Sequence, residues 1–180
     1  MLMSDKEKSK TAIEFKLRKL EASDAVSFAK YANNPLVAQN LRDVFPNPYT
    51  LEDAAGFISF CQSLDAKEAL TYCIDIGGQA VGCISVTKGK DVYSKSAEIG
   101  YWLGQEYWGH GIVTRAVKQI CSEAFEKLDI VRIHAEIFAS NLGSRAVLVK
   151  SGFVQEGVLR SAVFKNGRIQ DALAFALIKQ

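Results

Sequence analysis

Hydrophobic and polar residues alternate in several short stretches of this chain. Over residues 12–20, Ile13, Phe15 and Leu17 are separated by charged residues, which is typical of a strand with one buried face. Gly77-Gly78 separates two apolar runs further on, so we expect a hairpin there whose tight turn needs positive φ. Including the two arms of this hairpin, apolar or alternating runs predict strands over residues 71–76, 80–86, 96–103, 130–139, 153–160 and 169–178.

A spacing of three and four residues between apolar positions begins at Ile112 and predicts a long amphipathic helix. Shorter helices are expected over residues 23–33, 50–63 and 142–150, the second of them with Thr50 as its N-cap. The segment over residues 34–48 contains all 3 prolines of the chain and is expected to be mostly loop. The apolar stripe of the long helix consists of Val113, Ala116, Val117, Ile120, Cys121, Ala124 and Leu128.

These elements predict one mixed α/β domain of the α+β class over residues 12–180, because no internal repeat or linker interrupts them. An antiparallel first half that passes into a strand–helix–strand unit is the best interpretation of their order. Periodicity alone leaves the order of the strands in the sheet open. Residues 1–11 precede the first predicted strand, and we expect them to form a flexible tail.

Composition and hydropathy exclude several classes of protein. The 180 residues are 48% hydrophobic and 23% charged, which fits a folded domain and excludes a disordered chain. The longest apolar run, residues 172–178, is far too short to cross a bilayer. The first residues contain no apolar signal segment, so we expect a cytoplasmic location and no membrane association.

The charge balance and the few metal-ligating residues argue against two kinds of binding partner, nucleic acids and metal ions. Lys and Arg number 22 against 20 Asp and Glu, and this balance argues against a nucleic-acid-binding protein. The 4 cysteines form no CxxC pair and only 2 histidines accompany them, so we expect no metal site. Reduced, partly buried thiols are the simpler interpretation of the cysteines.

The most informative segment runs from the predicted strand that contains Glu98 into the long helix. Gly109 and Gly111 lie in the connection, where the free N–H groups at a helix start favour an anion such as a phosphate. The two glycines fit a tight turn equally well when they are taken alone. Neither a P-loop nor a dinucleotide fingerprint is present, because no Gly-Lys-Ser/Thr follows and Thr114 stands where the third glycine would be.

Three ordered motifs resemble the GNAT acetyltransferase superfamily, and within it the Rim-type ribosomal-protein N-terminal acetyltransferases. Residues 107–111, YWGHG, are similar to the YWGxG string of that branch. Of the superfamily signature R/Q-x-x-G-x-G/A the chain keeps Gly111, but it has Trp108 and Val113 at the first and last positions. Residues 141–153 are similar to N-x-x-S-x-x-x-x-x-K-x-G-F, and residues 156–167 also resemble the branch.

The resemblance implies a fold and a cosubstrate. The fold is a mostly antiparallel, twisted sheet that splays at its middle strands and has helices on both faces. The cosubstrate is acetyl-CoA, from which the acetyl group passes directly to a primary amine. The pyrophosphate is expected on the backbone N–H groups of Gly109, His110, Gly111, Ile112, Val113 and Thr114.

The same resemblance implies where the rest of the CoA lies. The pantetheine is expected beside Tyr101, Trp102 and Leu103, where an N–H of Trp102 or Leu103 polarises the thioester carbonyl. Asn141 matches a position that hydrogen-bonds the pantetheine, and either Arg115 or Lys150 is expected to assist in binding the anionic cosubstrate. Plain strand packing explains Tyr101 and Trp102 as well, and Asn141 also fits the N-cap of the helix that follows.

Two residues are candidates for proton transfer. Glu98 is the leading general base, with a structural ion pair as the alternative interpretation. Many superfamily members use a tyrosine as the acid where this chain has Leu148, and the resemblance implies Ser144 as the donor to the departing thiolate instead. Ser144 equally fits a residue that only satisfies the first turn of its helix. The segment over residues 161–164 lacks the second carboxylate that some relatives carry.

The acceptor is the least determined part of the hypothesis. Residues 39–49, with Arg42, Asp43, Phe45 and Tyr49, are expected to line its wall and to hold a peptide N-terminus or a small polar amine. A loop that packs its own side chains is the alternative. A competing hypothesis for the whole chain is a catalytically silent acyl-CoA-binding module, which Val113 and Leu148 favour. Either a monomer or a homodimer fits the expected fold.

Overall fold

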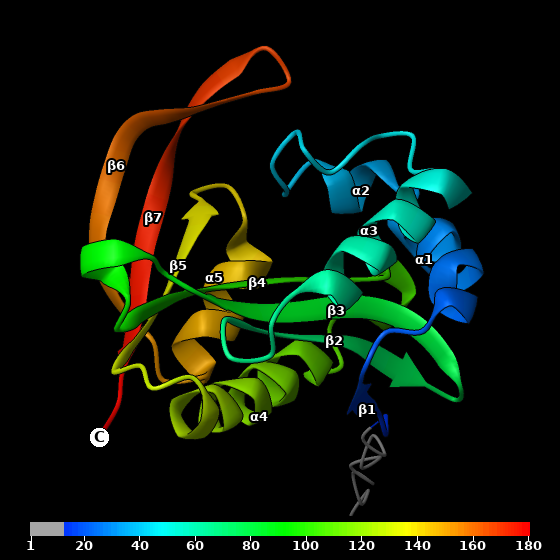
Figure 1. Ribbon diagram of the computed structural model, residues 1–180. Coiled ribbons are helices and arrows are strands. Elements are labelled where there is room, and N and C mark those ends of the chain that lie inside the picture. The colour runs from blue at the N-terminus through cyan, green and yellow to red at the C-terminus, as the bar shows by residue number, and fades with distance from the viewer. Residues whose placement is uncertain (1–12) are drawn as a thin grey trace, which may run out of the picture.

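A computed structural model of the chain describes residues 13–180 and builds them around a single sheet (Figure 1). Within this range the sheet has 7 strands in the order β1-β2-β3-β4-β5-β7-β6. All neighbouring strands are antiparallel except β4 and β5, which are parallel, so the expected mostly antiparallel sheet is confirmed. The predicted tail over residues 1–11 lies outside the described residues. The strands are β1 Lys16–Arg18, β2 Ala69–Ile76, β3 Gln79–Lys88, β4 Ser96–Leu103, β5 Arg132–Phe138, β6 Val154–Lys165 and β7 Arg168–Ile178.

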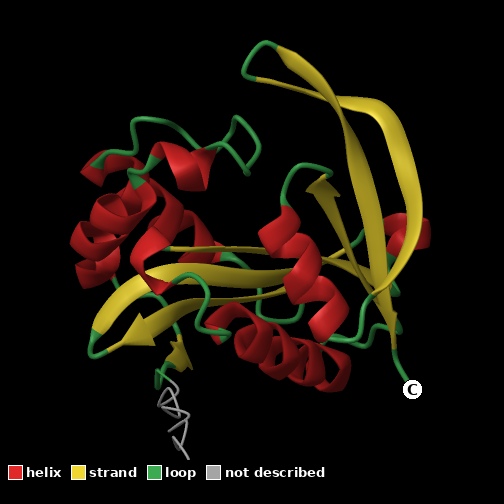
Figure 2. Cartoon of the chain, turned by 180° about the vertical axis from the view of Figure 1, so that it is seen from behind, coloured by secondary structure: helices red, strands yellow, loops and turns green. Residues whose placement is uncertain are grey.

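Helices cover both faces of the sheet, as expected. The α1 and α3 helices lie together on one face, whereas α4 and α5 lie on the other (Figures 1 and 2). None of the helices in residues 13–180 is long and apolar enough to cross a membrane. The α-helices are α1 Ala25–Ala32, α2 Pro35–Ala38, α3 Leu51–Ser63, α4 Ile112–Lys127 and α5 Leu142–Lys150, and the 3-10 helices are η1 Ala22–Asp24, η2 Asp91–Tyr93 and η3 Gln105–Tyr107.

The helices begin where their sequences place caps. At α3 the Thr50 hydroxyl accepts the Asp53 N–H (3.2 Å), and the Asp53 carboxylate accepts the Thr50 N–H (2.8 Å), which completes a capping box. The predicted stripe of α4 faces the core: Ala116, Val117 and Ala124 are fully buried against the sheet. Burial of this stripe is what holds α4 under the sheet.

Three elements differ from prediction by more than one or two residues. The first predicted strand pairs only over Lys16–Arg18, with Cys73 to Asp75 of β2 as its partners. The loop over residues 34–48 contains α2, which begins with Pro35 at its first position and with Asn34 as its cap. β6 continues to Lys165 beyond a bulge where Ser161 has a φ of 52° and its N–H donates to Asp171 (2.8 Å).

The sheet splays between its two parallel strands. β4 and β5 pair only from Ser96 to Glu98 on β4 and from Arg132 to His134 on β5. Both strands continue for several residues beyond these pairs, and β4 remains paired there with β3 on its other side. The separation leaves an open edge of β4 facing an open edge of β5, so the expected splay at the middle strands is confirmed.

Candidate active site

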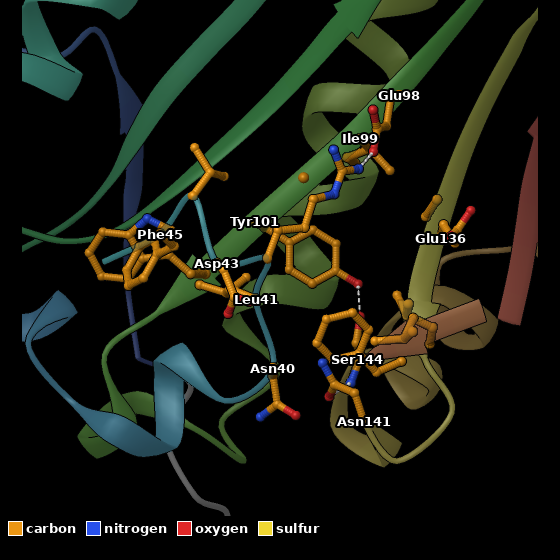
Figure 3. A pocket seen from close by; sticks show the side chains of 18 of the residues that line it. Asn40, Leu41, Asp43, Phe45, Glu98, Ile99, Tyr101, Glu136, Asn141 and Ser144 are labelled. Carbon is orange, nitrogen blue, oxygen red and sulfur yellow. Dashed lines mark hydrogen bonds and ion pairs between the residues drawn. The ribbon is translucent and has the colours of Figure 1, made fainter. Parts of the chain in front are cut away.

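A cavity of about 640 Å³ lies where β4 and β5 separate. Its walls are β3, β4 and β5, the segment between α2 and α3, Phe57 of α3, the start of α5 and the last residues of β6 (Figure 3). Segments that are far apart in the sequence therefore meet at the splay. A concave site with converging polar groups is the usual form of a small-molecule site.

Glu98 lies at one side of this cavity, on the face of β4 that also carries Trp102. The Glu98 carboxylate accepts a hydrogen bond from the Arg42 guanidinium and forms an ion pair with it. The Glu98 side chain remains 41% exposed, so it is accessible from the cavity. The structure thus supplies the ion-pair partner of the alternative interpretation and also a position suited to a base, and the two are compatible.

Tyr101 and Ser144 form a second polar pair on the opposite face of β4. Their hydroxyl oxygens are 2.7 Å apart, and both residues line the cavity. Burial raises the pKa of Tyr101 to about 12, so this phenol keeps its proton at neutral pH. Sequence reasoning expected Tyr101 only beside the pantetheine and missed this pair, because the contact depends on how α5 is placed against β4.

Asn141 both caps α5 and lines the cavity. Its side-chain oxygen accepts the Ser144 N–H (3.0 Å), as expected of an N-cap. This bond fixes the start of α5 and with it the Ser144 hydroxyl. Leu148 is fully buried one turn further on, so the position at which many superfamily members have a tyrosine belongs to the core here.

The start of α4 has the geometry of an anion site. Gly109 and Gly111 have φ of 78° and 69°, a left-handed conformation that glycine adopts at little cost. Among residues 13–180 no side chain caps this helix, and a Cβ at either glycine would meet nothing within 4 Å. Trp108 anchors the connection, because its indole N–H donates to the Leu103 carbonyl (2.7 Å). The N–H groups at the helix start are therefore free to bind a ligand.

Arg115 and Lys150 are the cations of α4 and α5 considered for cosubstrate binding, and only the Arg115 side chain makes a hydrogen bond within the described residues. Arg115, on α4, donates to the Ile13 carbonyl (2.5 Å) and lies over the Phe15 ring, so it anchors the segment before β1. Lys150, at the end of α5, is exposed and does not line the cavity. The role of Lys150 in binding the cosubstrate stays a prediction.

Residues 40–45 of the segment between α2 and α3 line the cavity, whereas Tyr49 is buried and does not line it. Asp43 pairs with Lys165 of β6 (2.6 Å), and the Lys165 side chain is only 9% exposed. Phe45 packs on Tyr49 and on Trp102, with ring centroids 4.8 and 6.0 Å apart. The segment thus packs its own side chains and also contributes some of them to the cavity wall, and its role in holding an acceptor stays a prediction.

Two charged lining residues, Lys165 and Glu136, were not considered from the sequence. Glu136 lies on β5, where it alternates with the buried Ala135, and it lines the cavity opposite β4 (Figure 3). The alternation within a predicted strand next to the splay was the available signal. Among residues 13–180 no group of three or more His, Cys, Asp or Glu side chains is arranged to hold a metal ion.

Comparison with known proteins identifies relatives by sequence. A family model described as "Acetyltransferase (GNAT) domain" matches residues 14–154. The chain is 30% identical over 100 residues to the ribosomal-protein-serine acetyltransferase of Escherichia coli, a match that covers 56% of this chain and 55% of that protein. It is 36% identical over 103 residues to the Bacillus subtilis protein YdaF, covering 57% of this chain and 56% of YdaF. The chain thus matches about half the length of these two relatives.

Solved structures show the same fold. RimL, a ribosomal L7/L12 α-N-protein acetyltransferase in complex with coenzyme A, superposes with a TM-score of 0.82 at 24% identity, covering 94% of this chain and 95% of RimL. The microcin C7 self-immunity acetyltransferase MccE, in complex with acetyl-CoA and AMP, gives a TM-score of 0.77 at 26% identity and covers 92% of each chain. The family model spans most of the chain and the resemblance seen in the three motifs is confirmed: this chain belongs to the GNAT acetyltransferase family.

Proposed function

We propose that this chain is an N-acetyltransferase that transfers the acetyl group of acetyl-CoA directly to a primary amine. The observation that carries the proposal is the cavity at the splay, with Glu98 on one face of β4 and the Tyr101–Ser144 pair on the other. Such an arrangement supplies a proton acceptor and a proton donor on the two sides of one reacting group. Acetyl-CoA and coenzyme A in the solved structures of MccE and RimL support the choice of cosubstrate.

In this proposal the pyrophosphate binds at the start of α4. Residues 109–114 provide backbone N–H groups, and the positive end of the helix dipole favours the anion. Gly109 and Gly111 allow close approach, because they add no side chain to the open space beside them. Trp108 stabilises the connection through its bond to Leu103, which offsets the loss of the usual Arg or Gln of the signature.

The thioester lies beside the open edge of β4. An N–H of Trp102 or Leu103 polarises its carbonyl, and Asn141 hydrogen-bonds the pantetheine arm. A backbone donor aimed at the developing oxyanion contributes a factor of about 10² or more to the rate in other acyl transfers. The open edge of β4 beyond Glu98 supports this role, because β5 takes up none of its hydrogen bonds there.

The chemical step moves three protons. The acceptor ammonium gives its first proton through Glu98 to water, and the free amine attacks the carbonyl carbon. As the C–N bond forms, the nitrogen loses its second proton to the Glu98 carboxylate. The C–S bond then breaks, and the CoA thiolate takes the Ser144 hydroxyl proton. Tyr101, which keeps its proton at neutral pH, donates a hydrogen bond to Ser144 and replaces that proton from solvent afterwards.

The acceptor in this proposal is a protein N-terminal α-amine or a small primary amine. The names of the Escherichia coli and Bacillus subtilis relatives, a "Ribosomal-protein-serine acetyltransferase" and a "Putative ribosomal N-acetyltransferase", support the first. The silent acyl-CoA-binding module is the second candidate, because Leu148 is a core residue and cannot act as the acid. The Tyr101–Ser144 pair favours the enzyme, since it provides a donor where that tyrosine is missing.

Free thiol release from acetyl-CoA tests the proposal. The acceptors are short peptides with N-terminal serine or alanine and a set of small primary amines, and mass spectrometry identifies the acetylated nitrogen. We expect acceptor-dependent thiol release and an acetylated α-amine. Binding of CoA without turnover of any of these acceptors would assign the chain to the silent module.

A further inference from the structure

Arg42 lines the cavity and pairs with Glu98, the carboxylate that the proposed reaction uses as its base. Its guanidinium pairs with Glu98, which is 56 residues away in the sequence, while most of the arginine side chain stays exposed. Lys165, the other cation that lines the cavity, pairs with Asp43. Of these two cations, Arg42 is therefore the one placed at the candidate base.

Neighbouring contacts hold Arg42 in this position. Asp43, the next residue, pairs with the buried Lys165 of β6, and Phe45 packs on Trp102 of β4. The segment is thus fastened to both sides of the splay, to β6 through Asp43 and to β4 through Phe45. The guanidinium lies over Glu98 because its chain neighbours are anchored on each side of the cavity.

A guanidinium and an acceptor ammonium are alternative partners for one carboxylate. Both are cations that donate hydrogen bonds, but only the ammonium can lose a proton to a carboxylate at neutral pH. We infer that Arg42 is a specificity-determining residue that occupies the place of the acceptor ammonium at Glu98, and that the acceptor amine binds by displacing it. The inference rests on the proposed function, because it takes Glu98 as the base that receives the amine.

The exposure of the Arg42–Glu98 ion pair limits how much its loss can change the affinity for the acceptor. Ion pairs as exposed as this one shift an equilibrium by roughly two- to fivefold, because water screens them and the long side chain loses freedom when it is held. An ammonium of the acceptor can therefore displace Arg42 at modest cost. Removing the guanidinium should improve acceptor affinity by about the same factor.

Equilibrium binding tests this inference without requiring turnover. The probe is a short peptide amide with an N-terminal serine, titrated by calorimetry into the protein saturated with CoA. We expect Arg42→Ala to bind the peptide about two- to fivefold more tightly than the wild type, and Arg42→Lys to bind it like the wild type.

Two further variants test whether the change in affinity comes from the Arg42–Glu98 contact itself. Gln39→Ala alters an exposed residue of the same segment that does not line the cavity, and it should leave the affinity unchanged, which controls for loosening of the segment. Adding Glu98→Gln to Arg42→Ala should abolish the gain, because the carboxylate is then missing. Unchanged or weaker binding by Arg42→Ala would overturn the inference. Tighter binding by that variant without acetylation of any acceptor would contradict the proposed function and leave the cation exchange at Glu98 established.

Discussion

Glu98 and Tyr101 are three residues apart on β4, so their side chains leave opposite faces of the strand. Glu98 shares its face with Trp102 and the segment between α2 and α3, whereas Tyr101 points to α5. A thioester beside β4 would therefore have its amine acceptor on one side and its thiolate on the other. This division by face is the physical basis for giving the two residues different roles.

The base assignment predicts a large loss of turnover in Glu98→Gln. The amide cannot take a proton from the ammonium, so kcat should fall by about 10²–10⁴-fold. CoA affinity should change little, because Glu98 lies on the face of β4 away from α5. Steady-state kinetics and calorimetry with CoA measure the two quantities, with Glu126→Gln on the exposed side of α4 as the matched control. A kcat within a few-fold of the wild type would remove Glu98 from the mechanism.

The hydroxyl pair predicts coupled effects on the departing thiolate. Ser144→Ala keeps the cap of α5, since Asn141 bonds the backbone N–H of residue 144, but it should lower kcat by about ten- to a hundredfold. Tyr101→Phe should lower kcat by about three- to tenfold, because it acts only through Ser144. In the double variant the tyrosine change should add almost nothing, as a double-mutant cycle measures. Independent, multiplying losses would show that the two hydroxyls do not act together.

The connection between β4 and α4 carries the two glycines that precede the helix. Gly111 takes a left-handed φ of 69° immediately before Ile112, which turns the first N–H groups of α4 outward and leaves them without a side-chain cap. Gly77, in the β2–β3 turn, has a comparable φ of 61° and equally open surroundings. Gly111 and Gly77 therefore have similar backbone conformations and surroundings, but only Gly111 lies at the start of α4.

This comparison predicts a specific effect of Gly111→Ala, with Gly77→Ala as its matched control. Each substitution should cost about 1–2 kcal/mol of folding stability, because a Cβ is disfavoured at positive φ. Only Gly111→Ala should also weaken CoA binding, by about ten- to a hundredfold, as expected when a hydrogen bond to a phosphate is disturbed. Chemical denaturation and calorimetry with CoA check both variants. Equal CoA affinities of the two variants would argue against the phosphate site at α4.

Sequence periodicity predicted these elements well wherever one face is buried against the sheet. The stripe from Val113 to Leu128 and the capping box of α3 are local signals, and both helices form where they indicate. β6 was predicted too short because its bulge at Ser161 breaks the alternation, while pairing with β7 carries the strand on to Lys165. The first strand was predicted too long because pairing partners, rather than alternation, determine its length.

At the scale of the whole molecule, the site depends on contacts that sequence patterns do not encode. The motifs indicated the family and the candidate residues Glu98, Asn141 and Ser144. The pairs Arg42–Glu98 and Tyr101–Ser144 join residues 56 and 43 positions apart, so they depend on the packing of whole segments across the splay. Periodicity reports which face of an element is buried, but it is silent on which element lies opposite.

The core that holds these segments together contains groups that must stay neutral. Burial raises the pKa of the Cys121 thiol in α4 from 9.0 to about 12, and burial likewise raises the pKa of Cys61 to about 11. In the unfolded chain the Cys121 thiol loses its proton as the pH passes about 9, whereas the folded protein keeps that proton up to about pH 12. The contribution of this thiol to folding stability is therefore complete below about pH 9 and is lost as the pH rises toward about 12.

Urea denaturation at about pH 8 and about pH 10.5, in the presence of a reductant, measures this loss. The Cys121 thiol alone should cost the wild type about 2 kcal/mol between these conditions, because one pKa unit corresponds to about 1.4 kcal/mol. Cys121→Ala lowers stability at every pH through its small cavity, but it removes this titration, so its loss between the two conditions should be smaller by about 2 kcal/mol. Equal losses in the two proteins would mean that Cys121 ionises as readily in the folded core as in the unfolded chain. The face of α4 that packs against the sheet would then be open to water.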